Sequence, residues 1–400
     1  MKEELSQPMC TPPGEIHGRV HKLQQKMEER GLELVLIIQN VDLFYFSGTI
    51  QKGFLFIPAE GEAILFVQKD FRRAVDESPL KCVKIETLRE LSGLLKDCQI
   101  EGKKVGMELD VVPVSLFSRI KGLFKDWNVL DVSSEIKEIR SVKSDFEMKQ
   151  IKKSGAIIDQ VFSQARDYFK EGTSELELDG ILTSIGRACG HQGFLRMRGF
   201  NQEMMNIHVL SGESASANSF CDTPLSGYGV TPAIAQGSSD RKFKRDQPVV
   251  IDYGGGYNGY VTDETRTFII GRLRGPLQKA YDVALKIIEE MESSVKPGNY
   301  PSQIYERSLE NASRTGLAEN FMGHGDGKVA FVGHGLGLEI NEWPILGRGY
   351  QKPLQVGNVF AFEPKFIFPG EGAIGIELDY VVRENGLERI TTFPRDLIVI

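Results

Sequence analysis

The spacing of apolar residues in the first third of the chain predicts alternating helices and strands. Gly31 follows a helical repeat of apolar residues and can end that helix. An apolar run at 34–38 predicts a buried strand, and runs at 53–57 and 63–67 predict a hairpin. Further patterns predict a strand at 105–107 and an amphipathic helix at 113–125. The residues of the first helical repeat are Ile16, Val20, Leu23 and Met27.

The pattern changes near residue 140, where long helices replace short elements. Two Ser-x-x-Glu sequences, at 144–147 and 174–177, have the spacing of a capping box, in which serine and glutamate side chains satisfy the first free amides of a helix. We therefore predict two domains, an α/β domain at 1–140 and a second domain at 141–400. Residues 196–245 are rich in Ser, Gly and Pro and predict a long irregular region.

The second domain continues with two helical repeats, at 276–296 and 302–315, and the last hundred residues predict glycine-punctuated strands. In the strand-forming stretches, carboxylates stand where apolar residues are expected. Asp252 and Asp263 lie in two predicted strands that flank a glycine-rich turn, which can bring both to one face.

Two glutamates, Glu363 and Glu377, occupy another pair of predicted strands, and His334 is flanked by glycines, where the backbone can approach a site closely. Burying four carboxylates without compensation is prohibitive, so each finds its own Arg or Lys, or they share a cation. Hard divalent metals prefer such oxygen ligands, and two metals need bridging carboxylates.

Each signal has a structural alternative. A single strand aspartate is more often a surface or turn residue, and Glu377 can pair with Arg383. Arg266 is expected to pair with a nearby residue and so to support the predicted strand that carries Asp263. A metal site is indicated only when five residues are taken together: Asp252, Asp263, His334, Glu363 and Glu377.

Composition narrows the class of protein. The chain has 400 residues, of which 41% are hydrophobic and 26% charged, as in ordinary globular proteins. Its net charge of −7 disfavours nucleic-acid binding. No apolar run reaches the roughly 18 residues of a membrane span, and the first residues do not form an apolar leader, so we expect a cytoplasmic protein without a membrane partner. Five dispersed cysteines with no Cys-x-x-Cys pair exclude a cysteine zinc site.

Three local sequences resemble the signatures of the pita-bread metallopeptidases, the group that contains methionine aminopeptidase, aminopeptidase P, prolidase and creatinase. They are Asp-x-Thr-Arg-Thr at 263–267, Gly-His-Gly-Leu-Gly-Leu-Glu at 333–339 and Phe-Glu-Pro at 362–364. The first domain, including Asn-Val-Asp-Leu-Phe-Tyr-Phe-Ser-Gly at 40–48, looks like the creatinase/prolidase N-terminal domain. The resemblance implies an α/β domain followed by an α+β pita-bread catalytic domain.

The resemblance also implies a dinuclear-metal hydrolase of the Xaa-Pro aminopeptidase or dipeptidase type, acting on a small peptide or amide as a homodimer. Two divalent ions, Mn²⁺ or Co²⁺, would be bound, with Asp263 and Glu377 bridging them. A bridging water would attack the scissile carbonyl, and Glu363 would relay its proton to the leaving amine. The implied ligands are Asp252, Asp263, His334, Glu363 and Glu377.

The sequence departs from the family pattern at three positions. Gln236 and Asn341 stand where relatives carry substrate-orienting histidines, and Gly375 stands where an arginine is frequent. Gln and Asn can donate to a developing oxyanion but cannot exchange protons near pH 7. His208 is a candidate for the missing imidazole. The departures leave open a C–N hydrolase or lyase of the creatinase-like branch, a metal-binding pseudo-enzyme and a non-catalytic binding module.

Overall fold

A computed structural model describes residues 9–400, and the chain divides into two units after Arg140. The first eight residues, on which the expectation of no apolar leader rests, lie outside the described residues. Among the described helices, none combines the length and apolar character needed to cross a bilayer.

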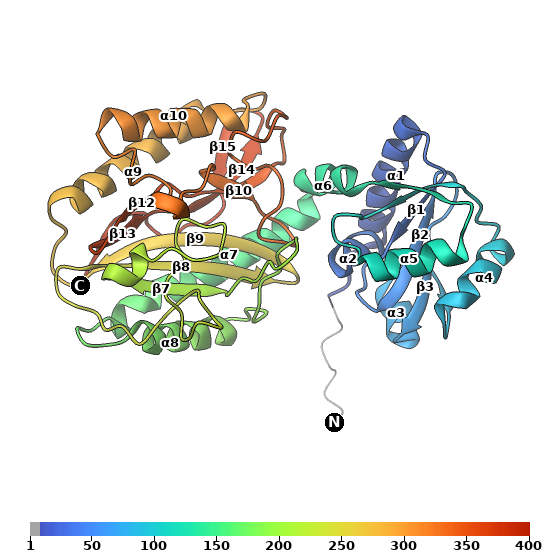
Figure 1. Ribbon diagram of the computed structural model, residues 1–400, viewed down its shortest axis with the longest axis horizontal. Helices are drawn as coiled ribbons and strands as arrows, with labels where there is room; N and C mark the ends of the chain where they lie inside the picture. Colours follow the sequence, from blue (N-terminus) through green and yellow to red (C-terminus); the bar gives the residue numbers. More distant parts are fainter. Residues whose placement is uncertain (1–8) are drawn as a thin grey trace. The chain divides into compact units, whose positions relative to one another are not determined.

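The first unit is built on a six-stranded sheet in the order β4-β3-β2-β1-β5-β6 (Figure 1). The sheet is mixed, because β1 pairs antiparallel with β2 and parallel with β5. Its strands are β1 (Leu34–Ile37), β2 (Lys52–Pro58), β3 (Ile64–Lys69), β4 (Lys81–Lys84), β5 (Lys104–Met107) and β6 (Asn128–Asp131). Its helices are α1 (Pro13–Arg30), α2 (Asn40–Ser47), α3 (Phe71–Glu77), η1 (Leu88–Glu90), α4 (Leu91–Asp97), α5 (Val114–Leu123) and α6 (Ser133–Ser141).

The predicted elements of this unit are present. Helix α1 ends at Gly31, whose φ of 59° is left-handed and whose amide bonds back to the last turn. The predicted hairpin is β2 paired with β3. The sequence pattern did not predict α2, in which the side chain of Gln39 caps the first amides.

The second unit places its strands in three small sheets. The first has the order β16-β9-β8-β7, the second β10-β11-β14-β15, and the third is the pair β12-β13. Their bounds are β7 (Ile207–Ser211), β8 (Pro248–Tyr257), β9 (Tyr260–Ile269), β10 (Gly333–Gly335), β11 (Val359–Phe362), β12 (Lys365–Phe368), β13 (Gly372–Gly375), β14 (Leu378–Arg383), β15 (Gly386–Arg389) and β16 (Ile398–Val399).

Four long helices cover these sheets. Helices α7 and α8 pack against β7, β8 and β9, whereas α9 lies against β12, β13 and β15 with α10 beside it (Figure 1). The helices and short 3₁₀ turns are α7 (Asp145–Ala165), η2 (Arg166–Tyr168), α8 (Glu175–Ala188), η3 (Gly212–Ser216), α9 (Gly275–Ser294), α10 (Pro301–Arg314) and η4 (Gly325–Gly327).

Local signals explain where the helices begin. Both predicted capping boxes are present, with Ser144 and Ser174 as N-caps of α7 and α8. The first of these helices stops at Ala165 and is followed by a 3₁₀ turn, so it is shorter than a helix continuing towards Gly172. The predicted irregular region contains β7 and η3 as its only regular elements among the described residues.

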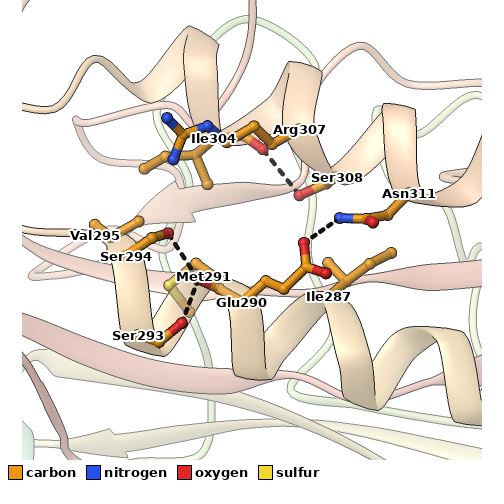
Figure 2. A pocket seen from close by; sticks show the side chains of 10 residues that line it. All are labelled: Ile287, Glu290, Met291, Ser293, Ser294, Val295, Ile304, Arg307, Ser308 and Asn311. Atoms are coloured by element: carbon orange, nitrogen blue, oxygen red, sulfur yellow. Dashed lines mark hydrogen bonds between the residues drawn. The ribbon is translucent and has the colours of Figure 1, made fainter.

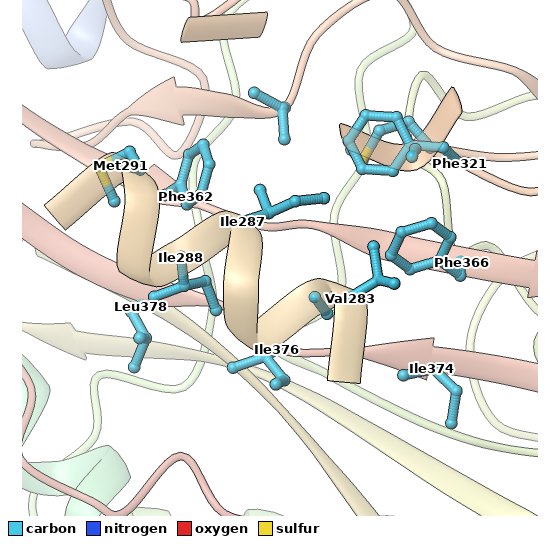
Figure 3. Close-up of a cluster of buried hydrophobic side chains, with 14 of the residues drawn as sticks. Val283, Ile287, Ile288, Met291, Phe321, Phe362, Phe366, Ile374, Ile376 and Leu378 are labelled. Atoms are coloured by element: carbon cyan, nitrogen blue, oxygen red, sulfur yellow. The ribbon is translucent and has the colours of Figure 1, made fainter. Parts of the chain in front are cut away.

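Helix α9 buries its apolar face against strands in the second half of this unit. Ile287, Ile288 and Met291 point from this helix towards strand residues that include Phe362 and Leu378 (Figure 3). Each fully buried side chain of this size contributes roughly 1.5–3 kcal/mol through removal of apolar surface from water. This core therefore holds the strands on which Glu363 and Glu377 depend.

Candidate metal centre

Strand register places the two aspartates on one face of the β8–β9 hairpin. Asp252 lies opposite Thr265, and Asp263 lies opposite Gly254. Because side chains alternate along a strand, Asp252 shares a face with position 254 and therefore with Asp263. The shared face agrees with the sequence-based expectation. The glycine-rich turn expected at 254–256 does not, because these glycines lie inside β8 and the hairpin turns at Asn258 and Gly259.

The two glutamates stand where one strand pair gives way to another. Phe362 pairs with Leu378 at the end of β11 and the start of β14, and Lys365 pairs with Gly375 at the start of β12 and the end of β13. Glu363 and Glu377 lie between these pairs, outside regular strand. The break in the ladder lets both carboxylates turn towards the aspartates.

His334 is the centre of β10, which pairs with β11. A Cβ atom at Gly333 would lie 2.2 Å from the carbonyl oxygen of Ala361, and one at Gly335 would lie 2.2 Å from that of Trp343. Both glycines are therefore required by close backbone approach, and this packing presents the imidazole to the carboxylates.

The five sequence-predicted ligands lie together. His334 Nε2 is 3.8 Å from Asp263 Oδ2, 3.6 Å from Glu363 Oε1 and 3.7 Å from Glu377 Oε1. Asp263, His334 and Glu377 each offer an atom within 4.8 Å of the others, an arrangement that can hold a metal ion. A divalent ion fits this oxygen-rich donor set with one imidazole.

Sequence reasoning missed Lys365, which lies among the same carboxylates. Its Nζ donates to Asp252 Oδ2 at 3.0 Å, to Glu363 Oε2 at 2.8 Å and to Glu377 Oε2 at 2.8 Å. Its side chain is only 2% exposed. A signal was available in the sequence, because Lys365 is the one charged residue of β12 and is followed by the apolar run Phe-Ile-Phe.

The electrostatics of the cluster are uneven. Burial lowers the pKa of Lys365, but the surrounding carboxylates outweigh burial and hold that pKa well above its usual value. Burial raises the pKa of Asp263, and the charges of Glu377 and Asp252 raise it further. Burial also raises the pKa of Glu377 to about 8, although Lys365 opposes this shift. Among the described residues, the carboxylate oxygens that face His334 therefore lack a neighbouring positive charge, as expected where a cation would bind.

Supporting hydrogen bonds orient the ligands. Thr265 Oγ1 donates to Glu377 Oε2 at 2.7 Å, and the amide of Asp263 donates to Asp379 Oδ2 at 2.9 Å. Arg266 is fully buried and donates to the carbonyl oxygen of Glu377 at 2.7 Å and to Glu264 Oε1 at 3.0 Å. The bond to Glu264 is the local pairing that the sequence predicted for Arg266, whereas the bond to Glu377 joins positions 111 apart in the chain.

A pocket of about 160 Å³ opens beside the carboxylates. Asn341 lines it, but its side-chain amide is bonded in both directions to the backbone of Arg198, at 2.8 Å each. Gln236 and His208 are not among the lining residues. The apolar part of the wall is made by Met197, Met204, Phe331, Ile340 and Ile345.

The two remaining candidates are buried nearby. His208 lies opposite Asp252 in the β7–β8 pairing, and its Nε2 atom has no hydrogen-bond partner. Burial lowers the pKa of His208, so its neutral form is favoured. The amide nitrogen of Gln236 donates to the carbonyl oxygen of Glu203 at 3.3 Å. The structure therefore brings the five predicted ligands together, but it does not place His208 and Gln236 in the pocket wall.

A second hollow, of about 210 Å³, lies between α9 and α10 (Figure 2). Several of its polar groups bond to each other or to the helix backbone: Asn311 Nδ2 donates to Glu290 Oε2 at 2.6 Å, and Ser308 Oγ donates to the carbonyl oxygen of Ile304 at 2.9 Å (Figure 2). These pairings leave the carboxylate pocket as the stronger candidate for chemistry.

Comparisons with known proteins agree with this geometry. Residues 149–384 match the model of metallopeptidase family M24, and residues 19–142 match the creatinase/prolidase N-terminal domain. The Xaa-Pro dipeptidase of Pyrococcus furiosus is 29% identical over 382 residues, which cover 95% of this chain and 99% of that relative.

Solved structures show the same fold along almost the whole chain. The prolidase of Pyrococcus horikoshii OT3 superimposes with a TM-score of 0.80 at 25% identity, covering 95% of this chain and all of that one. The X-Pro aminopeptidase of Thermotoga maritima MSB8 gives a TM-score of 0.79 at 26% identity, covering 95% and 99%. The predicted pita-bread architecture is confirmed. The chain belongs to metallopeptidase family M24, with a creatinase/prolidase N-terminal domain before its catalytic domain, and is a metal-dependent hydrolase.

Proposed function

We propose that the protein is a peptidase of the Xaa-Pro type, which hydrolyses the bond before proline in a short peptide. The observation that carries the proposal is the convergence of Asp263, His334 and Glu377 beside a small pocket whose wall is partly apolar. Such a pocket suits the apolar ring of proline next to the metal centre. The names of the relatives, Xaa-Pro dipeptidase and prolidase, support the same substrate class.

A divalent ion in this donor set supplies a Lewis acid and lowers the pKa of water bound to it. Glu363 is the residue that we propose moves the proton. Its Oε2 is held by Lys365 at 2.8 Å, which fixes the carboxylate, while Oε1 faces His334 at 3.6 Å. Oε1 can then accept a proton from the attacking water and deliver it to the leaving nitrogen.

The roles of the three predicted substrate-site residues, His208, Gln236 and Asn341, remain predictions. Because both polar atoms of Asn341 are occupied by Arg198, we propose that Asn341 positions the pocket wall rather than contacting the reacting atoms. His208, which lies opposite Asp252, and Gln236, which bonds to the carbonyl oxygen of Glu203, stay candidates for orienting the substrate. A kcat-against-KM comparison of His208→Phe and Gln236→Leu would separate substrate binding from the chemical step.

Further properties follow only from the resemblance. We propose Mn²⁺ or Co²⁺ as the activating metal, a homodimer as the assembly and the cytoplasm as the compartment. Reconstitution of metal-free protein with single metals, sedimentation equilibrium and cell fractionation test these three statements. A preference for another metal, a monomer or an extracellular location would correct the corresponding statement alone.

The substrate proposal is tested by a hydrolysis screen of metal-reconstituted protein. The panel comprises Xaa-Pro dipeptides, longer Xaa-Pro-Xaa peptides, matched Xaa-Ala peptides and cyclic amides. We expect cleavage of Xaa-Pro bonds and little cleavage of the Xaa-Ala controls. Cleavage confined to cyclic amides would instead support a C–N hydrolase of another type, and equal cleavage of Pro and Ala peptides would remove the proposed specificity.

A further inference from the structure

We propose that the ammonium group of Lys365 takes the place of one of the two metal ions, so that the centre binds a single divalent ion beside a built-in organic cation. The inference deepens the proposed function and rests on it, because it concerns the same metal centre. It follows from how Lys365 divides the carboxylate oxygens.

The two oxygens of Glu363 and of Glu377 face different partners. Lys365 Nζ bonds to Oδ2 of Asp252 at 3.0 Å and to Oε2 of both Glu363 and Glu377 at 2.8 Å. These three bonds use all three donors of an ammonium group. The other oxygens of the glutamates, Oε1 in each, lie 3.6 Å and 3.7 Å from the imidazole of His334.

A second metal ion would compete for the same oxygens. A divalent ion binds carboxylate oxygen at about 2 Å, so an ion bound to these three atoms would lie within the volume of Nζ. So close to Nζ, the positive charge of the second ion would also repel the ammonium group strongly, because the site is buried. Either the lysine leaves the cluster or the second ion stays out.

The surrounding structure keeps Lys365 in place. Its carbonyl oxygen accepts from the amide of Met322 at 2.9 Å, and it pairs with Gly375 across β12 and β13. A Cβ atom at Gly375 would lie 3.1 Å from Lys365 Cγ and 3.1 Å from Thr265 Cγ2. The glycine, one of the departures noted in the sequence, therefore leaves the room in which the lysine stem lies.

The division assigns different roles to the two aspartates. Asp263 lies with His334 and Glu377 in the set that can hold an ion. Asp252 binds Lys365 and is not part of that set. Asp252 is therefore a counter-ion of the lysine in this chain, whereas the family pattern alone would make it a metal ligand.

The first test is a metal count on the full-length wild-type chain. Protein is stripped with chelator, equilibrated with excess Mn²⁺, freed of loose metal and analysed by native mass spectrometry and elemental analysis. We expect one ion per chain. Two ions per chain would overturn the inference and leave the proposed function intact, whereas no bound ion would overturn both.

Variants test the assignment of each residue. Lys365→Met removes the ammonium at similar length, so we expect about two ions per chain. Asp252→Asn should keep one ion, because the residue faces the lysine, whereas Asp263→Asn should keep none. A folded Lys365→Met protein that still binds one ion, or an Asp252→Asn protein that loses its ion, would contradict the proposal.

A matched control separates these effects from the general cost of removing a buried lysine. Lys143 is also buried and donates to Glu342 Oε2 at 2.8 Å within the same unit, outside the metal-binding set. Lys143→Met should lower stability and still bind one ion. If Lys365→Met does not fold, the wild-type and Asp252→Asn counts decide the question. Absence of Xaa-Pro hydrolysis in protein carrying one ion would refute the proposed function alone.

Discussion

Thr265 and Glu377 are joined by a hydrogen bond of 2.7 Å from Oγ1 to Oε2, although the two residues lie 112 positions apart in the chain. The bond links strand β9 to the segment before β14 and directs one oxygen of Glu377, leaving Oε1 towards His334. Partners of this kind orient metal ligands, and their loss typically costs about 10–100-fold in metal affinity or activity.

We therefore expect Thr265→Val to weaken Mn²⁺ binding about 10–100-fold while the fold is retained. Isothermal titration calorimetry on stripped protein measures the change. Thr267→Val is a matched control, because the Thr267 hydroxyl bonds to the backbone of Gly375 rather than to a ligand carboxylate. Equal losses of affinity in both variants would show that the effect does not depend on the bond to Glu377.

Arg266 and Glu264 form a fully buried ion pair at 3.0 Å. Removing one partner of such a pair leaves an uncompensated charge and costs roughly 3–5 kcal/mol. Arg266→Met should accordingly lower the free energy of unfolding in urea by about that amount. Arg266→Lys should rescue only part of the loss, because an ammonium cannot reproduce the several bonds that the guanidinium fork makes.

A double substitution tests whether the loss arises from the stranded carboxylate. Glu264→Gln in the Arg266→Met background removes the unpaired charge, so we expect stability to recover in part. A double variant less stable than Arg266→Met, by the full cost of Glu264→Gln alone, would show that the two side chains act independently.

Asn341 makes two hydrogen bonds of 2.8 Å with the backbone of Arg198. Asn341→His would install an imidazole, yet it cannot reproduce both bonds. We expect a stability loss of about 2 kcal/mol at roughly 1 kcal/mol per bond, with a higher KM for peptide substrates. Asn341→Asp keeps the acceptor for the Arg198 amide but turns a second carboxylate oxygen towards the Arg198 carbonyl oxygen, so we expect it to lose at least as much stability at neutral pH. A gain in kcat for Asn341→His would instead show that this position contacts the reacting atoms.

We expect His191 to make the free energy of unfolding depend on pH. Its Nδ1 accepts from the amide of Gly193 at 2.9 Å, and its Nε2 lies 2.9 Å from the carbonyl oxygen of Gly254. Burial lowers the pKa of His191, against the opposing effect of the Gly254 bond. Between this lowered pKa and about pH 6.5, the folded state therefore binds fewer protons than the unfolded state.

The resulting stability is fully present above about pH 6.5 and is lost as pH falls towards the lowered pKa of the folded state. His191→Gln should flatten the fall in unfolding free energy between about pH 7.5 and 5.5, although His208 contributes a slope of the same sign. Urea unfolding at several pH values measures this. An unchanged slope in His191→Gln would mean that His191 does not titrate differently in the two states.

Much of the fold was predictable because local physics determines it. The capping boxes at Ser144 and Ser174 mark true helix starts, and Gly31 ends α1 as a left-handed residue. Short elements such as α2 were not predicted, since a helix of eight residues leaves little periodic signal and depends on a side-chain cap by Gln39.

The carboxylates and the histidine of the site could be identified from motif order and spacing, but their division between a metal ion and Lys365 could not. The sequence shows a lysine beside apolar strand residues, which indicates that Lys365 needs a buried partner. Only the folded structure shows which carboxylates it contacts. Asn341 likewise lies at the pocket, but only the structure shows that Arg198 occupies its amide. Contacts between residues more than a hundred positions apart depend on packing that no local pattern encodes.

We propose that the set of Asp263, His334 and Glu377 holds the metal ion with which this chain hydrolyses Xaa-Pro bonds. The most direct measurement is hydrolysis of an Ala-Pro dipeptide by wild-type and Asp263→Asn protein, each assayed after chelation and again after addition of Mn²⁺ or Co²⁺. We predict that chelation abolishes wild-type activity, that metal restores it, and that folded Asp263→Asn stays inactive throughout. Full activity in chelated protein, or metal-restored activity in Asp263→Asn, would contradict the account.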